Sequence, residues 1–164
     1  MRRKDKEIVD RPLIDWIMHQ AQVCRLGLCQ DNQPYIVPLS FGYDNHKIYF
    51  HTATAGTKIT IFLAHPQVCF EMEHDVKIIE DEQSPCKWSH SYFSVIGFGT
   101  VHEINELDAK KEALNQIMRH YSHKDWSFAG LPLENVRLWA IDISEISGKK
   151  SKDKKALNNY NDSV

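Results

Sequence analysis

The chain is poor in cysteine, nearly neutral in charge and free of long apolar runs, and each absence argues against a class of protein. Its 164 residues hold four cysteines and no Cys-x-x-Cys pair, unlike a disulfide scaffold or a tetrahedral zinc domain. A formal net charge of −2 gives no electrostatic basis for general binding to nucleic acid or to anionic membranes. The apolar runs are far shorter than the ~20 residues of a membrane-spanning helix. We therefore expect neither nucleic acid nor membrane as a partner.

The remaining composition predicts one globular domain in the cytoplasm. Hydrophobic residues make up 42% of the chain and charged residues 26%, which is ordinary for a globular protein. The N-terminal segment MRRKDKEIVDRP has basic residues but no apolar stretch after them, so we do not expect a secretory signal. The last residues, 148–164, are charged and poor in apolar side chains. We expect a domain over 1–147 and a disordered tail over 148–164.

Cysteine and histidine are expected to play no metal-binding part. Cys24 and Cys29 lie in one predicted strand at an odd spacing, so their side chains face opposite sides and cannot readily pair. All four cysteines are expected to be reduced. The chain has nine histidines, but His90, His102, His120 and His123 fall on separate predicted elements or loop ends, and no metal site is predicted.

Hydrophobic periodicity predicts six strands and three helices. The strands are expected over 23–29, 34–43, 47–52, 68–79, 92–104 and 136–146. The helices are expected after a cap at Asp10, over 57–65 and over 107–121. Gly97 and Gly99 interrupt the fifth strand, which is typical of a bulge, a barrel corner, or close approach of another backbone or a ligand. This order favours a mainly antiparallel barrel with closed edges and helices at its rim, while the pattern alone also permits an α+β sandwich.

The most informative segment is the loop HTATAGTK over 51–58, between the third strand and the second helix. Free backbone N–H groups, threonine hydroxyls and the Lys58 ammonium can all face an anion at a helix start. A positive side chain there is unfavourable for the helix dipole, and a nearby anion would explain it. The alternative is that Lys58 is solvated and that the hydroxyls satisfy their own backbone.

Seven segments in this order resemble one family. They are CRLGL at 24–28, PYIVPLSFGY at 34–43, IYFHTA with GTK at 48–58, PQVCFE at 66–71, CKWS at 86–89, SVIGFG at 94–99 and MRHY at 118–121. The chain resembles the flavin-binding split-barrel family typified by pyridoxamine 5′-phosphate oxidase, and most closely its nitroimidazole-resistance (Nim) branch. The resemblance implies a split barrel that binds FMN, with FAD as an alternative, and forms a homodimer.

The resemblance also implies a flavin-dependent oxidoreductase acting on a small molecule, in the Nim branch a nitroaromatic. Lys58 matches a basic residue that contacts the flavin phosphate, and His51 matches a histidine beside the flavin, where it is either an acid catalyst or a ligand. The cofactor-binding residues that it implies are Val37, Pro38, Leu39, Ser40, His51, Thr52, Ala53, Thr57, Lys58, Trp88, Ser94, Val95, Ile96 and Gly97.

Several alternatives stay open from the sequence. Trp88 either covers the flavin ring or lies in a core or dimer interface. Arg25 either contacts a ligand or pairs with Glu71 or Glu73. The chain departs from many Nim relatives at 90–93, so its substrate is open. The competing functions are a pyridoxamine 5′-phosphate oxidase proper and a non-catalytic binder of flavin or haem.

Overall fold

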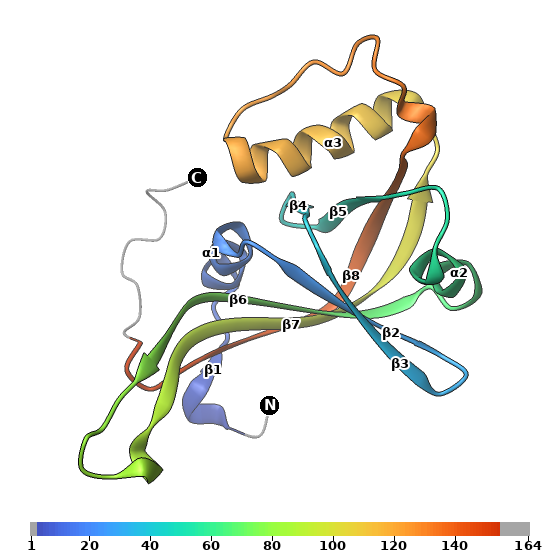
Figure 1. Ribbon diagram of the computed structural model, residues 1–164. Coiled ribbons are helices and arrows are strands. Elements are labelled where there is room, and N and C mark those ends of the chain that lie inside the picture. Colours follow the sequence, from blue (N-terminus) through green and yellow to red (C-terminus); the bar gives the residue numbers. More distant parts are fainter. Residues whose placement is uncertain (1–2, 155–164) are drawn as a thin grey trace.

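The computed structural model describes residues 3–154, which form one antiparallel sheet with three helices (Figure 1). The strands are β1 Glu7–Ile8, β2 Cys24–Gln30, β3 Gln33–Leu39, β4 Gly42–Tyr43, β5 Lys47–Thr52, β6 Gln67–Ile79, β7 Ser89–Ile104 and β8 Arg137–Lys150. The helices are α1 Arg11–Gln20, α2 Thr57–Ala64 and α3 Leu107–Ser122. Short 3-10 turns lie at Lys4–Lys6, Pro85–Lys87 and Leu133–Asn135.

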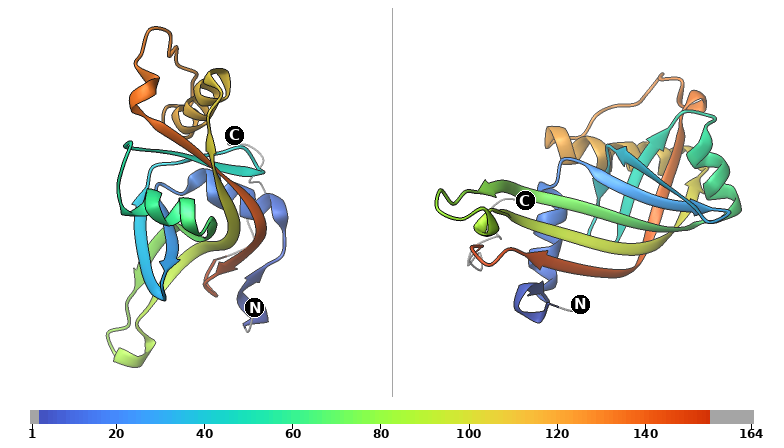
Figure 2. Two further views of the ribbon diagram at one scale, coloured as in Figure 1. Left: turned by 90° about the vertical axis from the view of Figure 1, so that its right-hand side faces the viewer. Right: turned by 60° about the horizontal axis from the view of Figure 1, so that its bottom comes forward.

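The sheet runs in the order β3-β2-β6-β7-β8-β5-β4, and β1 pairs with the end of β8. The long strands β6, β7 and β8 curve strongly, so the sheet coils around a core (Figure 2). We expected its edges to close. Within residues 3–154, however, β3 pairs only with β2 and β4 only with β5, so the barrel stays split between them.

The main core lies inside this coil. It joins the apolar face of α1, including Leu13 and Ile17, to inward side chains of the strands and to α2. β6 shows the expected alternation, with Val68, Phe70 and Met72 buried. A smaller cluster packs α3 against the outside of the sheet. All four cysteines are free, and Cys24 is buried while Cys29 is exposed, as their opposite orientations require.

The predicted strand over 34–43 is two strands in the structure. β3 ends at Leu39, and the Phe41 N–H donates to the Tyr121 hydroxyl at 3.1 Å instead of continuing the ladder. Beyond this break, β4 pairs with β5 at the other edge of the sheet. Sequence could not show the break, because Tyr121 comes from α3, 80 residues further along.

The expected domain boundary at 147 falls inside a strand. β8 continues to Lys150, and Gly148 lies so close to Ile8 and Ile14 that an added Cβ would meet both at 2.9 Å. The expected tail is therefore wrong for residues 148–150. Ser151 extends the fold further, since its N–H donates to the Tyr92 carbonyl at 3.0 Å. The part of that prediction that concerns 155–164 lies outside the described residues.

The two glycines of β7 are explained by close packing. A Cβ on Gly97 would lie 2.2 Å from Phe70 Cζ and 2.7 Å from the Glu145 carbonyl. A Cβ on Gly99 would lie 2.5 Å from the Asp142 carbonyl, beside a bulge in the β7–β8 pairing. Of the expectations for these positions, the bulge and the close backbone approach are confirmed.

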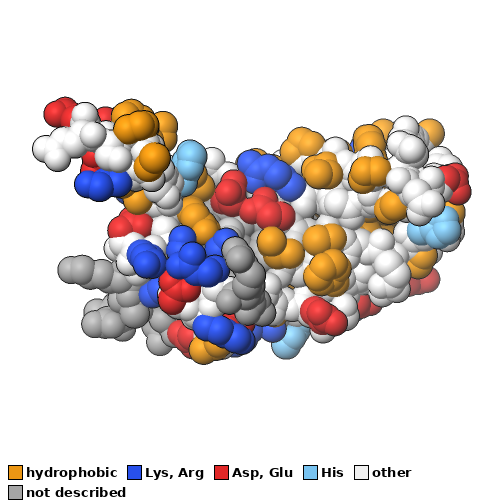
Figure 3. Space-filling view, turned by 90° about the horizontal axis from the view of Figure 1, so that it is seen from below, with side chains coloured by type: hydrophobic (Ala, Val, Ile, Leu, Met, Phe, Trp, Pro, Cys, Tyr) orange, Lys and Arg blue, Asp and Glu red, His pale blue; other side chains and the backbone are white. Residues whose placement is uncertain are grey.

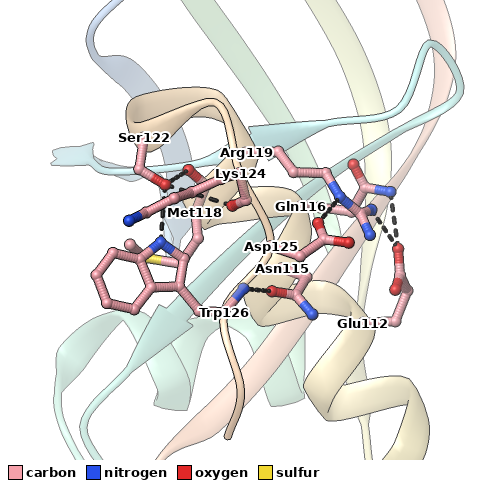
Figure 4. A network of polar contacts seen from close by, with 9 residues as sticks. All are labelled: Glu112, Asn115, Gln116, Met118, Arg119, Ser122, Lys124, Asp125 and Trp126. Carbon is pink, nitrogen blue, oxygen red and sulfur yellow. Dashed lines mark hydrogen bonds and ion pairs between the residues drawn. The ribbon is translucent and has the colours of Figure 1, made fainter.

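The segment after α3 is held against the helix by polar contacts (Figure 4). The Arg119 guanidinium bonds to Asp125, and the Trp126 backbone N–H donates to Asn115 Oδ1 at 2.8 Å. The Trp126 indole N–H donates to Ser122 Oγ at 2.9 Å. These contacts order the beginning of a linker that the sequence marks only as polar.

Candidate flavin site

The connection from β5 to α2 has the form expected of an anion site. Gly56 occupies the N-cap position of α2 with φ of 143°, and no side chain makes a capping hydrogen bond to this helix start. No acidic residue lies in its first turn. Lys58 follows at the second helical position, half-buried, and no carboxylate of residues 3–154 forms an ion pair with it. A helix start with free N–H groups and an unpaired ammonium is suited to a phosphate.

Thr52 and His51, which close β5, point to opposite faces of the strand. Thr52 is buried, accepts a hydrogen bond from the Trp139 indole at 3.0 Å, and donates to the Ala53 carbonyl at 2.8 Å. Its hydroxyl therefore belongs to the core, and only its backbone is left for a ligand. His51 is exposed on the outer face, opposite Leu138 of β8. Ala53 and Thr57 are exposed in or beside the same loop.

The residues predicted on β3 and β7 also divide between two faces. Those that face the core and are buried or half-buried are Val37, Leu39, Val95 and Gly97. Those that face outward are Pro38, Ser94 and Ile96, and Ser40 is exposed just after β3. A ligand bound on the outward face can contact the side chains of the second group. It can reach at most the backbone of the first group.

Arg25 lies on the outward face between these two strands. In the sheet register Pro38 pairs with Arg25, Arg25 with Glu71, and Glu71 with Ile96. Arg25 Nη1 lies 3.1 Å from Glu71 Oε2 and 3.4 Å from Glu73 Oε2, so the ion-pair alternative for Arg25 is confirmed. Burial and the neighbouring Glu73 charge raise the pKa of Glu71 above its usual value, against the effect of Arg25.

Apolar side chains are exposed on the same face. Ile36 is 69% exposed, Ile96 46% and Phe98 50%. Ile36 and Phe98 occupy one row across the sheet, linked through Gly27 and Cys69, and Ile96 lies in the next row. The view from below shows hydrophobic side chains gathered beside charged ones (Figure 3). Exposed apolar groups clustered in this way are typical of an interaction surface.

The model of the family described as pyridoxamine 5′-phosphate oxidase matches residues 10–150. The chain belongs to this family. The expected split barrel is confirmed, because the sheet and its helices have the architecture of flavin-binding split-barrel proteins.

Individual relatives agree with this assignment. A candidate 5-nitroimidazole antibiotic resistance protein from Bacteroides thetaiotaomicron is 30% identical with a TM-score of 0.77, over 87% of this chain and 85% of that one. The FAD and haem binding protein from Mycobacterium smegmatis is 19% identical with a TM-score of 0.79, over 92% and 77% of the two chains, and shows the fold alone. An uncharacterized protein from Rhizobium meliloti is 26% identical over 65 residues, which is 40% of this chain and 42% of that protein. The match thus spans less than half the length of this curated relative.

In this member of the pyridoxamine 5′-phosphate oxidase family, Trp88 lies far from the loop over 51–58 of the same chain. It ends the turn Pro85–Lys87 at the tip of the β6–β7 hairpin, and Figure 1 shows that tip and α2 at opposite ends of the molecule. Its indole N–H donates to the Asp81 carbonyl at 2.8 Å, and half of its surface is exposed. One chain alone therefore does not bring Trp88 and Lys58 together.

A cavity of about 680 Å³ lies beside Arg25, and the sequence did not indicate it. It is lined by Gln20, Gln22, Val23, Arg25, Glu73, His74, Asp75 and Val76. The sequence suggests pairing of Arg25 with Glu71 or Glu73, but Gln20 and His74 reach the cavity only because α1 packs against β6. A sequence pattern carries no signal for that contact.

The histidines do not gather into a metal centre. Across residues 3–154 no three His, Cys, Asp or Glu side chains are placed to hold a metal ion. His120 serves the structure: its Nε2 bonds to the Ala21 carbonyl at 2.7 Å, and burial lowers its pKa. Among residues 3–154, no helix is both long and apolar enough to cross a membrane.

Proposed function

We propose that this chain binds a flavin, FMN or alternatively FAD, and passes electrons to a small nitroaromatic acceptor. The observation that carries the flavin proposal is Lys58, unpaired at the uncapped start of α2 in a family whose fold binds flavins. The nitroaromatic acceptor is supported by the similarity to the candidate nitroimidazole resistance protein from Bacteroides thetaiotaomicron.

The loop over 51–58, called the phosphate loop below, would hold the anionic end of the cofactor. Lys58 supplies the charge, the first amides of α2 supply N–H donors, and Thr57 adds a hydroxyl. The open space around Gly56, where a Cβ would meet no atom within 4 Å, leaves room for a phosphate. The residues present thus fit a flavin phosphate.

A bound flavin would supply the two electrons and two protons that its dihydro form loses, enough to convert a nitro group to a nitroso group and water. The chain contributes position and relays one of these two protons to the acceptor. His51 is exposed at the end of β5, where the phosphate loop begins, and a ring nitrogen of an imidazole can donate a proton to a bound acceptor. We assign it to proton delivery at Nδ1 or Nε2.

We further propose that two copies meet through the outward face that carries Ile36, Ile96 and Phe98. An isoalloxazine ring needs a wall on each side, and one chain offers only an open surface there. A second copy would cover these apolar side chains and bring its own Trp88 toward the ring. The flavin site would then be complete only in the dimer.

The test begins with the visible spectrum of the purified protein. The two visible flavin absorption bands support the proposal, whereas a Soret band would indicate haem. The flavin-loaded protein is then reduced anaerobically with dithionite and mixed with a 5-nitroimidazole. Reoxidation faster than that of free FMN supports a nitroreductase, because a bound acceptor is held near the ring. Reoxidation no faster than that of free FMN would support flavin binding but not nitroreductase activity.

A further inference from the structure

Both ends of the phosphate loop contact one indole ring. At its beginning, the Thr52 hydroxyl accepts a hydrogen bond from the Trp139 indole N–H at 3.0 Å and donates to the Ala53 carbonyl at 2.8 Å. At its end the loop enters α2, the helix that carries Lys58, and Phe62 of this helix packs against the same indole with ring centres 5.0 Å apart. The position of the Trp139 ring therefore influences both ends of the loop.

Arg137, the first residue of β8, lies over this indole. Its Cζ is 4.8 Å from the centre of the Trp139 ring, which is a cation–π contact. In the sheet register Arg137 pairs with Thr52, so it is the neighbour of the strand end where the loop begins. Arg137 thus adjoins the first end of the loop and also contacts the ring against which the second end packs.

Glu103 of β7 fixes the orientation of the Arg137 guanidinium. Arg137 Nε donates to Glu103 Oε1 at 2.7 Å, and Nη2 donates to Oε2 at 2.5 Å. A bidentate pair of this kind restricts the plane of the guanidinium, which a single contact would not do. These bonds also hold the pKa of the Glu103 carboxyl below its usual value, so the pair is charged at neutral pH. In the register Glu103 pairs with Trp139, which places the three residues side by side.

The Arg137 guanidinium has little charge to offer a ligand. Its positive charge is matched by the Glu103 carboxylate, and two of its nitrogens are engaged in that pair. The Lys58 ammonium, in contrast, forms no ion pair with a carboxylate of residues 3–154. The contacts of Arg137 therefore favour a role in orienting the indole over direct binding of a phosphate.

We propose that Arg137, oriented by Glu103, is a positioning residue for flavin binding. It holds the Trp139 indole, and the indole holds the two ends of the phosphate loop so that Lys58 and the first amides of α2 converge on the phosphate. The proposal rests on the proposed function, since the phosphate is that of the flavin. Arg137 acts through the loop and neither touches the flavin nor supplies charge to it.

Three substitutions test this role by the Kd of the apoprotein for FMN. Arg137→Gln removes the cation–π contact and the bidentate pair, and we expect a Kd roughly fivefold higher, as for the loss of one partly exposed stacked cation. Arg137→Lys keeps the charge but cannot form two parallel bonds to one carboxylate, so it should not restore binding. Glu103→Ala leaves Arg137 in place and frees its charge, and we expect the Kd to rise here as well.

The last variant separates positioning from direct binding. If Arg137 contacted the phosphate itself, releasing it from Glu103 would strengthen FMN binding, and Arg137→Lys would retain most of the affinity. Either result overturns the proposal, as does an unchanged Kd in all three variants.

Arg11→Gln is the matched control. The Arg11 guanidinium likewise bonds a carboxylate, that of Asp15 at 2.8 Å, and an aromatic side chain through the Tyr43 hydroxyl at 2.9 Å, but it belongs to α1. Its replacement should lower the Tm without changing the Kd. A rise in Kd equal to that of Arg137→Gln would assign the effect to a general loss of stability and would also overturn the proposal.

Hydrogen exchange of the flavin-free protein gives a readout independent of the cofactor. The N–H groups of Ile59 and Thr60 donate to the Gly56 carbonyl at 3.0 and 3.3 Å, in the first turn of α2. Their exchange, followed by NMR, should be about fivefold faster in Arg137→Gln, because the same contact is lost from the closed loop, and unchanged in Arg11→Gln. A protein that binds no flavin but shows this faster exchange would contradict the proposed function and not the positioning role. Equal Kd and equal exchange in wild type and Arg137→Gln would contradict only the positioning role.

Discussion

The indole N–H of Trp139 donates to the Thr52 hydroxyl at 3.0 Å inside the barrel. Trp139 belongs to β8 and Thr52 ends β5, so this bond fixes the strand end from which the phosphate loop departs. Phe62 of α2 packs against the same indole, with ring centres 5.0 Å apart. Trp139 thereby connects the core to both sides of the loop that carries Lys58.

Thr52→Val should destabilise the protein without removing a ligand contact. Valine keeps the shape of threonine but leaves the buried Trp139 N–H without an acceptor, which costs about 1–3 kcal/mol. Urea denaturation measures the change in the free energy of unfolding. Thr54→Val, at an exposed position in the loop, is the matched control and should change it by less than about 0.5 kcal/mol. Equal stability of Thr52→Val and wild type would show that the bond is not important.

Lys58→Ala should weaken flavin binding and leave the fold intact. A charge-assisted contact to phosphate contributes about 1.5–3 kcal/mol, so we expect roughly a 10- to 150-fold higher Kd for FMN. Titration of the apoprotein by flavin fluorescence quenching measures it. Lys152→Ala, an exposed lysine beyond β8, serves as the control. An unchanged Kd in Lys58→Ala would remove this residue from the site.

His51→Ala should slow reoxidation of the reduced flavin by a nitroaromatic while flavin stays bound. Loss of a positioned proton donor costs on the order of 100-fold in rate. His51→Asn keeps a hydrogen-bonding side chain but cannot deliver a proton near neutral pH, so it should not restore the rate. If either variant instead loses flavin, His51 is a cofactor ligand and not an acid.

Gly97→Ala should disturb the core and not the cofactor site directly. The new Cβ would lie 2.2 Å from Phe70 Cζ, and such overpacking costs about 1–3 kcal/mol. Gly27→Ala is the control, because its Cβ would meet nothing closer than 3.5 Å. Adding Phe70→Leu to Gly97→Ala should recover part of the thermal stability. Absence of any recovery would assign the strain to the Glu145 carbonyl instead.

Acid should weaken the attachment of α3 through His120. Burial lowers the pKa of His120 from its ordinary 6.5, so the folded state binds fewer protons than the unfolded state. Its contribution to stability is complete above that ordinary value and is lost as the pH falls toward the folded pKa. The Tm should fall less in His120→Gln than in wild type between about pH 7.5 and about pH 5. His65→Gln, at an exposed position, should behave like wild type.

The sequence predicted most of the fold, because local patterns report burial directly. Apolar positions at helical spacing identified α1 with its buried Leu13 and Ile17, and alternation identified β6. The loop ending in Lys58 could be recognised because its residues are contiguous. Its threonine, glycine and lysine need no distant segment to form the anion site that we propose.

Only the tertiary structure decided how these pieces face one another. It turned the Thr52 hydroxyl into the core toward Trp139, 87 residues away, and divided the residues of β3 and β7 between two faces of the sheet. It also built the cavity at Glu73 from α1, β2 and β6. Such relationships depend on strand register and helix docking, and these are set by many weak contacts between distant segments. A local pattern fixes which side chains are buried, whereas register and docking decide which of them meet.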